Sequence, residues 1–223
     1  MNRFVSFLVI SILIVTFGSG LSFAQSSGSF NFSADTLSCT DIGGTLGGGT
    51  AKTALKTTMK VSSGNGVALV IRPSAVVGLL TNLSLSGKAG GGTVSASSQS
   101  GVQFQVTVSP LSGQALPTVT PSAPVTFDDR FLQISTNLFS LLSTCTSDTA
   151  DSTCFFDFNE TTLSAHSFDW VVTNMSSGDY GITVSWNPYT SFSAPNNALA
   201  CVGPVVLTAQ QTKIFNQNTG ISF

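Results

Sequence analysis

Two-residue alternation of apolar and polar side chains recurs along this chain and constrains its fold more than any other feature. The clearest case is the stretch 102–108, in which valine or phenylalanine occupies every second position and glutamine or threonine lies between. Similar alternation occurs at 30–33, 59–62, 168–173 and 182–187. Successive side chains of a strand point to opposite faces, so this pattern predicts strands that are buried on one face. After residue 24 no segment has a convincing helical period.

Short strands joined by loops of uneven length predict an all-β fold. We expect a two-sheet antiparallel β-sandwich with the topology of a jelly roll. Glycine-rich loops are expected at 43–49 and 87–92, and the proline-rich stretch 110–124 is interpreted as a surface loop. The strand pattern is the same on both sides of that stretch, so residues 25–223 are expected to form a single domain.

Two hairpins are predicted from local sequence. Gly64-Asn65-Gly66 lies between two alternating runs, and Asn-Gly in this position is a strong hairpin signal. In the second hairpin, Val172 and Trp170 would pair with Ile182 and Val184 across the turn at 174–179. Both tryptophans, Trp170 and Trp186, are expected in the core because they lie on apolar strand faces.

The first 24 residues predict the destination of the chain. Asn2 and Arg3 precede an apolar run that ends at Phe17, and Ser22-Phe23-Ala24 offers small residues for cleavage after Ala24. This is the pattern of a secretory signal peptide, residues 1–24. The run is shorter than the about 20 residues that span a bilayer, which argues against a membrane anchor. We therefore expect a secreted protein, extracellular or periplasmic, with no membrane span after cleavage.

Charge is sparse and excludes some partners. The 223 residues include 8 Lys and Arg and 10 Asp and Glu, with a formal net charge of −2. No basic stripe is present, so nucleic acid is not an expected partner. Ser, Thr, Asn and Gln must supply most of the polar surface. Such a surface suits packing against identical copies, since little charge would lose its hydration, although a simple soluble surface is the alternative.

Four cysteines lie in the part expected to be exported, where disulfides form readily. Four cysteines can pair in three ways. We favour Cys145–Cys154, which closes a short polar loop, together with Cys39–Cys201. A zinc site is disfavoured because no closely spaced cysteine or histidine pair is present.

One stretch resembles a known family. The alternation and glycine turn of 165–172 and 177–184 are similar to a late hairpin of the tumour-necrosis-factor-like jelly-roll domains, and such hairpins occur in secreted bacterial proteins. This resemblance covers about a tenth of the chain. It implies a trimer or a filament-forming adhesive module and implies no functional residue.

Candidates for catalysis and metal binding are few. His166 is the only histidine, so a serine hydrolase would have to use it, and no Gly-x-Ser-x-Gly motif accompanies it. The pair Asp157 and Glu160 is the better carboxylate candidate for a glycosidase. Calcium is the metal we consider, with a loop cluster as its ligands, although the spacing matches no EF-hand. The calcium candidates are Asp148, Asp151, Asp157 and Glu160.

Sugar binding would need exposed aromatic side chains. Tyr180 and Tyr189 lie near predicted loop ends and are the candidates for binding an extracellular glycan.

The leading hypothesis is a non-enzymatic structural or adhesive β-sandwich subunit with no required cofactor, which assembles with copies of itself. In one version, the segments 29–33 and 208–223 complete the sheet edge of a neighbouring copy. The alternative hypotheses are a glycan-binding module, assisted by calcium, and a hydrolase.

Overall fold

Two antiparallel sheets make up the described part of the molecule. The computed structural model describes residues 29–42, 52–62, 66–88, 91–137, 153–192 and 198–213. The larger sheet contains β1 (Phe30–Asp35), β2 (Ser38–Asp41), β4 (Val67–Lys88), β6 (Thr118–Thr120), β8 (Thr153–Ser167), β9 (Trp170–Thr173) and β11 (Ala198–Lys213). The smaller sheet contains β3 (Lys52–Val61), β5 (Val94–Pro110), β7 (Val125–Thr136) and β10 (Gly178–Phe192). The predicted all-β, two-sheet antiparallel sandwich is confirmed.

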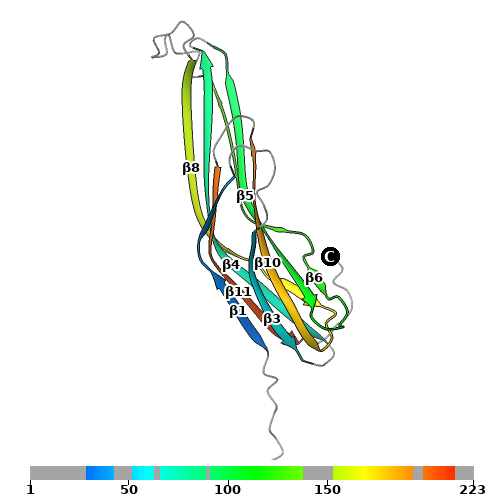
Figure 1. Cartoon of the computed structure of the whole chain (residues 1–223). Helices are drawn as coiled ribbons and strands as arrows, with labels where there is room; N and C mark the ends of the chain where they lie inside the picture. The colour runs from blue at the N-terminus through cyan, green and yellow to red at the C-terminus, as the bar shows by residue number, and fades with distance from the viewer. Residues whose placement is uncertain are drawn as a thin grey trace, which may run out of the picture.

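The first and last strands lie side by side. The larger sheet has the order β1-β11-β4-β9-β6, with β2 added on β11 and β8 on β4. The smaller sheet has the order β3-β10-β5-β7. Strands β8 and β9 follow one another along the same edge of β4, β8 beside 74–88 and β9 beside 69–71. Figure 1 shows the long strands β4, β5 and β8 running together toward one end of an elongated molecule.

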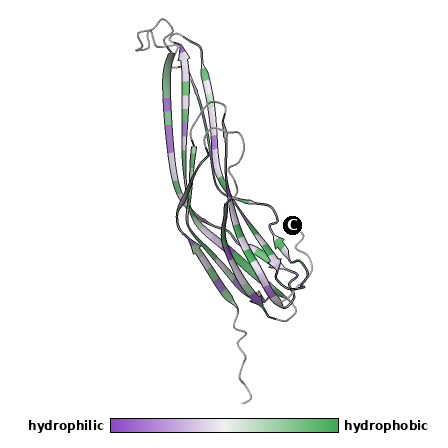
Figure 2. Cartoon of the chain, viewed as in Figure 1, coloured by the Kyte–Doolittle hydropathy of each residue, from purple (hydrophilic) through white to green (hydrophobic). Residues whose placement is uncertain are grey.

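The core lies between the sheets and follows the alternation seen in the sequence. Along β5, Val102, Phe104, Val106 and Val108 are all buried, as predicted. Trp170 from the larger sheet and Trp186 from the smaller one are also buried, which confirms their expected place. Figure 2 shows hydrophobic and hydrophilic segments alternating along the strands.

Both predicted hairpins are wrong. Strand β3 belongs to the smaller sheet and β4 to the larger, so the chain crosses from one sheet to the other between Val61 and Val67. Likewise β9 pairs with β4 and β6, whereas β10 pairs with β3 and β5. Alternation requires that each strand bury one face, and two strands can do so either as neighbours in one sheet or by facing one another across the core. Here the two strands of each predicted hairpin belong to different sheets.

A polar layer divides the interior into two apolar clusters. The large cluster contains both tryptophans, and the small one gathers Leu83, Leu85 and Ala96 near one end. Between them, Thr81 Oγ1 and Ser100 Oγ lie 2.7 Å apart and join the two sheets in a buried hydrogen bond. At the rim of the same layer, Arg130 Nη1 lies 3.5 Å from Glu160 Oε1.

Candidate interaction surfaces

The outer face of the larger sheet is apolar over much of its area. The odd-numbered residues of β4 point to the core, so the even-numbered ones point outward with their neighbours in register. We call this surface the apolar face. Its exposed members are Phe30, Phe32, Leu163, Val171 and Val206, and half-buried Val70, Val76, Leu80 and Leu199 lie among them.

Leu163 is the most exposed side chain of the apolar face, at 78%. It lies opposite Gly78, where an added Cβ would come 3.5 Å from Leu163 Cδ1 and 3.7 Å from Cys201 Cβ. Since Gly78 has no side chain, Leu163 can lie across the middle of the sheet and remain open to solvent.

The Cys39–Cys201 disulfide is confirmed, and it borders the apolar face. It joins β2 to β11, and Cys201 lies opposite Gly78 on β4. The bond therefore fastens an edge strand to the outer side of the sheet. Cys154 is also disulfide-bonded. Its predicted partner, Cys145, lies outside the described residues.

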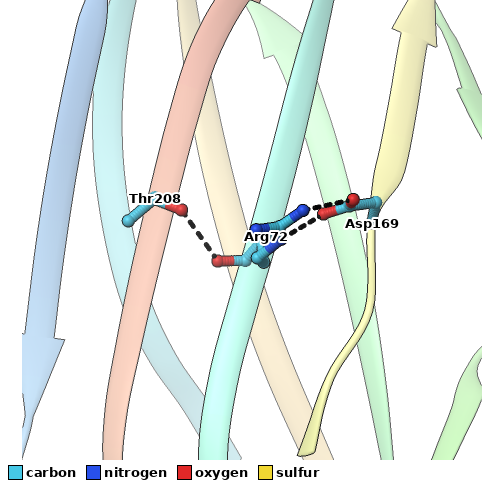
Figure 3. A network of polar contacts seen from close by, with 3 residues as sticks. All are labelled: Arg72, Asp169 and Thr208. Carbon is cyan, nitrogen blue, oxygen red and sulfur yellow. Dashed lines mark hydrogen bonds and ion pairs between the residues drawn. The ribbon is translucent and has the colours of Figure 1, made fainter.

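Charges on the apolar face neutralise one another. Arg72 Nε donates a hydrogen bond of 2.6 Å to Asp169 Oδ1, and Arg72 Nη2 donates one of 2.6 Å to Asp169 Oδ2 (Figure 3). These hydrogen bonds lower the pKa of Asp169 and raise the pKa of Arg72. Among the described side chains in the rows of the face from Val70 to Val76, this pair supplies the only charges. This part of the face therefore carries no net charge.

The outer face of the smaller sheet has the opposite character. We call it the polar face. Its outward residues on β5 and β10 are mostly amides and hydroxyls: Gln99, Gln103, Gln105, Thr107, Thr183, Ser185, Asn187 and Ser191. A hollow of about 540 Å³ lies over Gly181 and is bordered by Lys56 and Leu111. A second hollow, of about 180 Å³, is lined by Gln103, Gln105, Pro124, Ser185, Trp186 and Asn187.

Tyr189 lies in a polar network on this face. Its ring covers Gly101, where an added Cβ would collide with the ring and hydroxyl of the tyrosine. Burial, together with a hydrogen bond to Asp129, raises the pKa of Tyr189 to about 12. Gln99 Nε2 donates to both carboxylate oxygens of Asp129, at 3.0 and 2.9 Å. Phe131, opposite Gln99 in the register, is 60% exposed beside this network.

The expected exposure of Tyr180 is wrong. Tyr180 is fully buried, and its hydroxyl donates to the carbonyl of Ser176 at 3.1 Å. The residue lies on the inward face of β10, where alternation with Ile182 and Val184 places it in the core. Its nearness to a loop end was a poor guide to exposure, because the strand begins at Gly178.

Of the four calcium candidates, the structure describes Asp157 and Glu160, and it does not bring these two together. Asp157 lies opposite outward-facing Ser84, and Glu160 lies opposite buried Thr81. Three residues apart on one strand, the two carboxylates point to opposite faces. The same geometry separates them as a glycosidase pair. Asp148 and Asp151 lie outside the described residues, and within the part that the structure covers no group of three or more metal-ligating side chains is found.

His166 takes part in a short polar chain at the open side of the sandwich. Ser164 Oγ donates to Asp128 Oδ2 at 2.7 Å, and His166 Nε2 lies 2.7 Å from the same hydroxyl. Since the single hydroxyl proton is directed to the carboxylate, His166 acts as the donor to Ser164 in this geometry. A serine nucleophile needs the reverse, with the histidine accepting the hydroxyl proton.

Sequence reasoning missed the apolar face, although one signal was present. Residues 76–80 form an uninterrupted apolar run, and a strand with apolar side chains on both faces has two surfaces to cover. The alternation at 30–33 predicted a strand correctly but not its orientation. Phe30 and Phe32 face solvent, whereas Asn31 turns toward β3, where its side-chain amide donates to the carbonyl of Thr58 at 2.7 Å.

No known family and no curated protein matches this chain. Among the described residues, no helix is long and apolar enough to span a membrane.

Proposed function

We propose that this protein is a secreted, non-enzymatic structural or adhesive subunit whose copies associate through the apolar face. The observation that carries the proposal is the group of exposed phenylalanine, leucine and valine side chains on the outer side of the larger sheet. Single exposed apolar residues are ordinary on soluble proteins, but a contiguous apolar patch is typical of an interaction site.

The face is large enough for a specific interface. It spans four neighbouring strands and about ten residues along β4, which at roughly 4.8 Å per strand and 3.3 Å per residue gives about 600 Å². A standard interface buries about 800 Å² on each partner, counted as accessible surface rather than projected area. Close packing of this face against another would therefore reach the lower part of the standard range.

A second copy of the chain is the occupant that suits the face. Most homodimers are built on a two-fold axis that places the same patch on both subunits. A patch with net charge would repel its own copy, whereas here Arg72 and Asp169 already form a pair within one subunit. Docking would then shield apolar side chains without leaving an unpaired charge in the interface.

Strand exchange is a second form of the same association. In the structure, Phe30–Asp35 pairs with Val205–Gln210 of its own chain. The segments expected to exchange, 29–33 and 208–223, therefore pair with one another in part, and residues 214–223 lie outside the described residues. Exchange would require β1 to leave β11 and take the same register on another copy. Cysteines placed at Phe32 and Thr208, which are directly opposite, distinguish the forms: exchange gives a covalent dimer on a non-reducing gel, and face-to-face docking gives an internal crosslink.

We infer a jelly roll because β1 with β2, and β8 with β9, act as continuous strands. Apart from the short β6, this gives eight main strands in two four-stranded sheets.

Export through a signal peptide at 1–24, which lies outside the described residues, is supported by the disulfide-bonded cysteines.

A matched pair of leucine variants tests the association. Leu163 and Leu116 are 78% and 77% exposed, but Leu116 lies in the loop between β5 and β6 and is not a member of the apolar face. In size-exclusion chromatography with light scattering, Leu163→Thr should shift the mature protein toward monomer and Leu116→Thr should not. Equal behaviour of the two variants and the parent would contradict the proposal.

A further inference from the structure

The small hollow on the polar face contains an unpartnered polar atom. Asn187 Oδ1 is buried and accepts no hydrogen bond from the described residues. A buried acceptor without a partner costs about 1–3 kcal/mol, and such groups are rare in folded proteins. The amide of Gln103, in register with Asn187 on the neighbouring strand, also makes no side-chain hydrogen bond within the described chain. The oxygen itself has almost no accessible surface, so the groups that the hollow presents to a ligand are the NH₂ group of Asn187 and the amide of Gln103.

An ordered aromatic side chain lies one row along the polar face from the hollow. Tyr189 follows Asn187 by two residues on β10, so it lies in the next row of the same outer face. The ring is held over Gly101, and Asp129 fixes its hydroxyl. Exposed Phe131 lies one row further. A rigid aromatic side chain offers a flat apolar surface next to polar groups at little cost in conformational entropy.

From these neighbours we infer that the polar face carries a binding site for a neutral carbohydrate, centred on Asn187 and Gln103 and flanked by Tyr189. A sugar hydroxyl both donates and accepts hydrogen bonds, which matches an amide oxygen and an amide NH₂ group presented together. The apolar C–H face of a pyranose ring fits against an aromatic ring. This site lies on the opposite side of the sandwich from the apolar face, so it adds an activity independent of self-association.

The surroundings favour a neutral sugar over a peptide or an anionic glycan. At Gln103 and Phe104, β5 is paired with β10 on one side and with β7 on the other. A peptide therefore finds no free strand edge at Gln103. The carboxylate of Asp129 is already engaged by Gln99 and Tyr189, and no cation lines the hollow.

Three single substitutions on the polar face test the inference. Asn187→Val removes the accessible NH₂ group together with the unpartnered oxygen, and Gln103→Ala removes the free amide. Thr107→Val introduces the same valine at an exposed position of β5 that lines neither hollow. Binding of the mature protein to cellohexaose, mannohexaose and hyaluronan hexasaccharide is measured by isothermal titration calorimetry.

We expect at least one neutral hexasaccharide to bind. Asn187→Val and Gln103→Ala should each weaken binding by about tenfold, or about 1.4 kcal/mol, with no loss for Thr107→Val. Asn187→Val should unfold at the same temperature as the parent or higher, because it removes an unsatisfied buried acceptor. Binding of hyaluronan alone, of no saccharide, or of a neutral one unaffected by both hollow variants would overturn the inference. If Asn187→Val does not fold, Gln103→Ala decides.

Discussion

The buried hydrogen bond between Thr81 and Ser100 gives a quantitative prediction about how the two sheets are held together. Thr81 is 1% exposed and Ser100 is fully buried, and their hydroxyls lie 2.7 Å apart across the interior. Thr81→Val keeps the shape of the side chain and removes its hydroxyl. Ser100→Ala removes the other hydroxyl and leaves a very small gap.

The double change should cost less than the two single changes added together. Either variant leaves one buried hydroxyl without its partner, and the desolvation penalty of such a group is about 1–3 kcal/mol. The double variant leaves neither hydroxyl, so its free energy of unfolding should fall by less than the sum of the two singles. We expect a coupling energy of about 1–2 kcal/mol from the double-mutant cycle.

Urea denaturation of the disulfide-intact mature protein measures these values, provided that the slope with denaturant is unchanged. Ser98→Ala is the matched control, because Ser98 Oγ is buried in the same layer and has no partner. Its removal should be neutral or stabilising. If the two single changes add to within about 0.5 kcal/mol of the double, the hydroxyls do not interact and the reasoning is refuted.

Three further predictions concern the disulfide and two titrating groups. Cys39 and Cys201 are 162 residues apart, and for a loop of this length the chain-entropy relation predicts that the disulfide stabilises the fold by about 5 kcal/mol. Replacing both cysteines with serine should therefore lower the urea midpoint sharply, and an unchanged midpoint would contradict this. The pKa of Tyr189 is raised to about 12, so the free energy of unfolding should fall as the pH rises from about 10, the ordinary pKa of tyrosine, to about 12. Tyr189→Phe should abolish this fall, and alkaline denaturation followed by circular dichroism checks both expectations. The pKa of Asp169 is lowered by Arg72, so the stabilising effect of the pair is present above about pH 4 and is lost as the pH falls through the lowered pKa. In Asp169→Asn, the urea midpoint should depend less on pH over this acid range than it does in the parent.

Local patterns identified the strands and the core, but not how the strands are arranged. Alternation at 102–108 predicted which side chains of β5 are buried, because burial on one face follows from the two-residue period alone. The same period does not say whether the next strand is a neighbour or lies across the core. The chain therefore crosses between the two sheets from β3 to β4 and from β9 to β10, although the intervening sequences suggested hairpins.

The candidate surfaces were even less accessible to sequence reasoning. Tyr180 and Tyr189 looked equivalent, yet they differ by an odd number of residues along β10 and so point to opposite faces. The apolar face gathers residues from β1, β4, β8, β9 and β11, which are far apart in the chain. Their common orientation is set by register, and register depends on the assembled sheet.

Self-association through the apolar face is the central claim, and sedimentation equilibrium of the mature protein over a range of concentrations tests it most directly. We predict a reversible transition from monomer to a defined oligomer, which is shifted to higher concentration when Leu163 and Val206 are both replaced by threonine. A single species of monomer mass at every concentration, in the parent and in the variant alike, would contradict the claim.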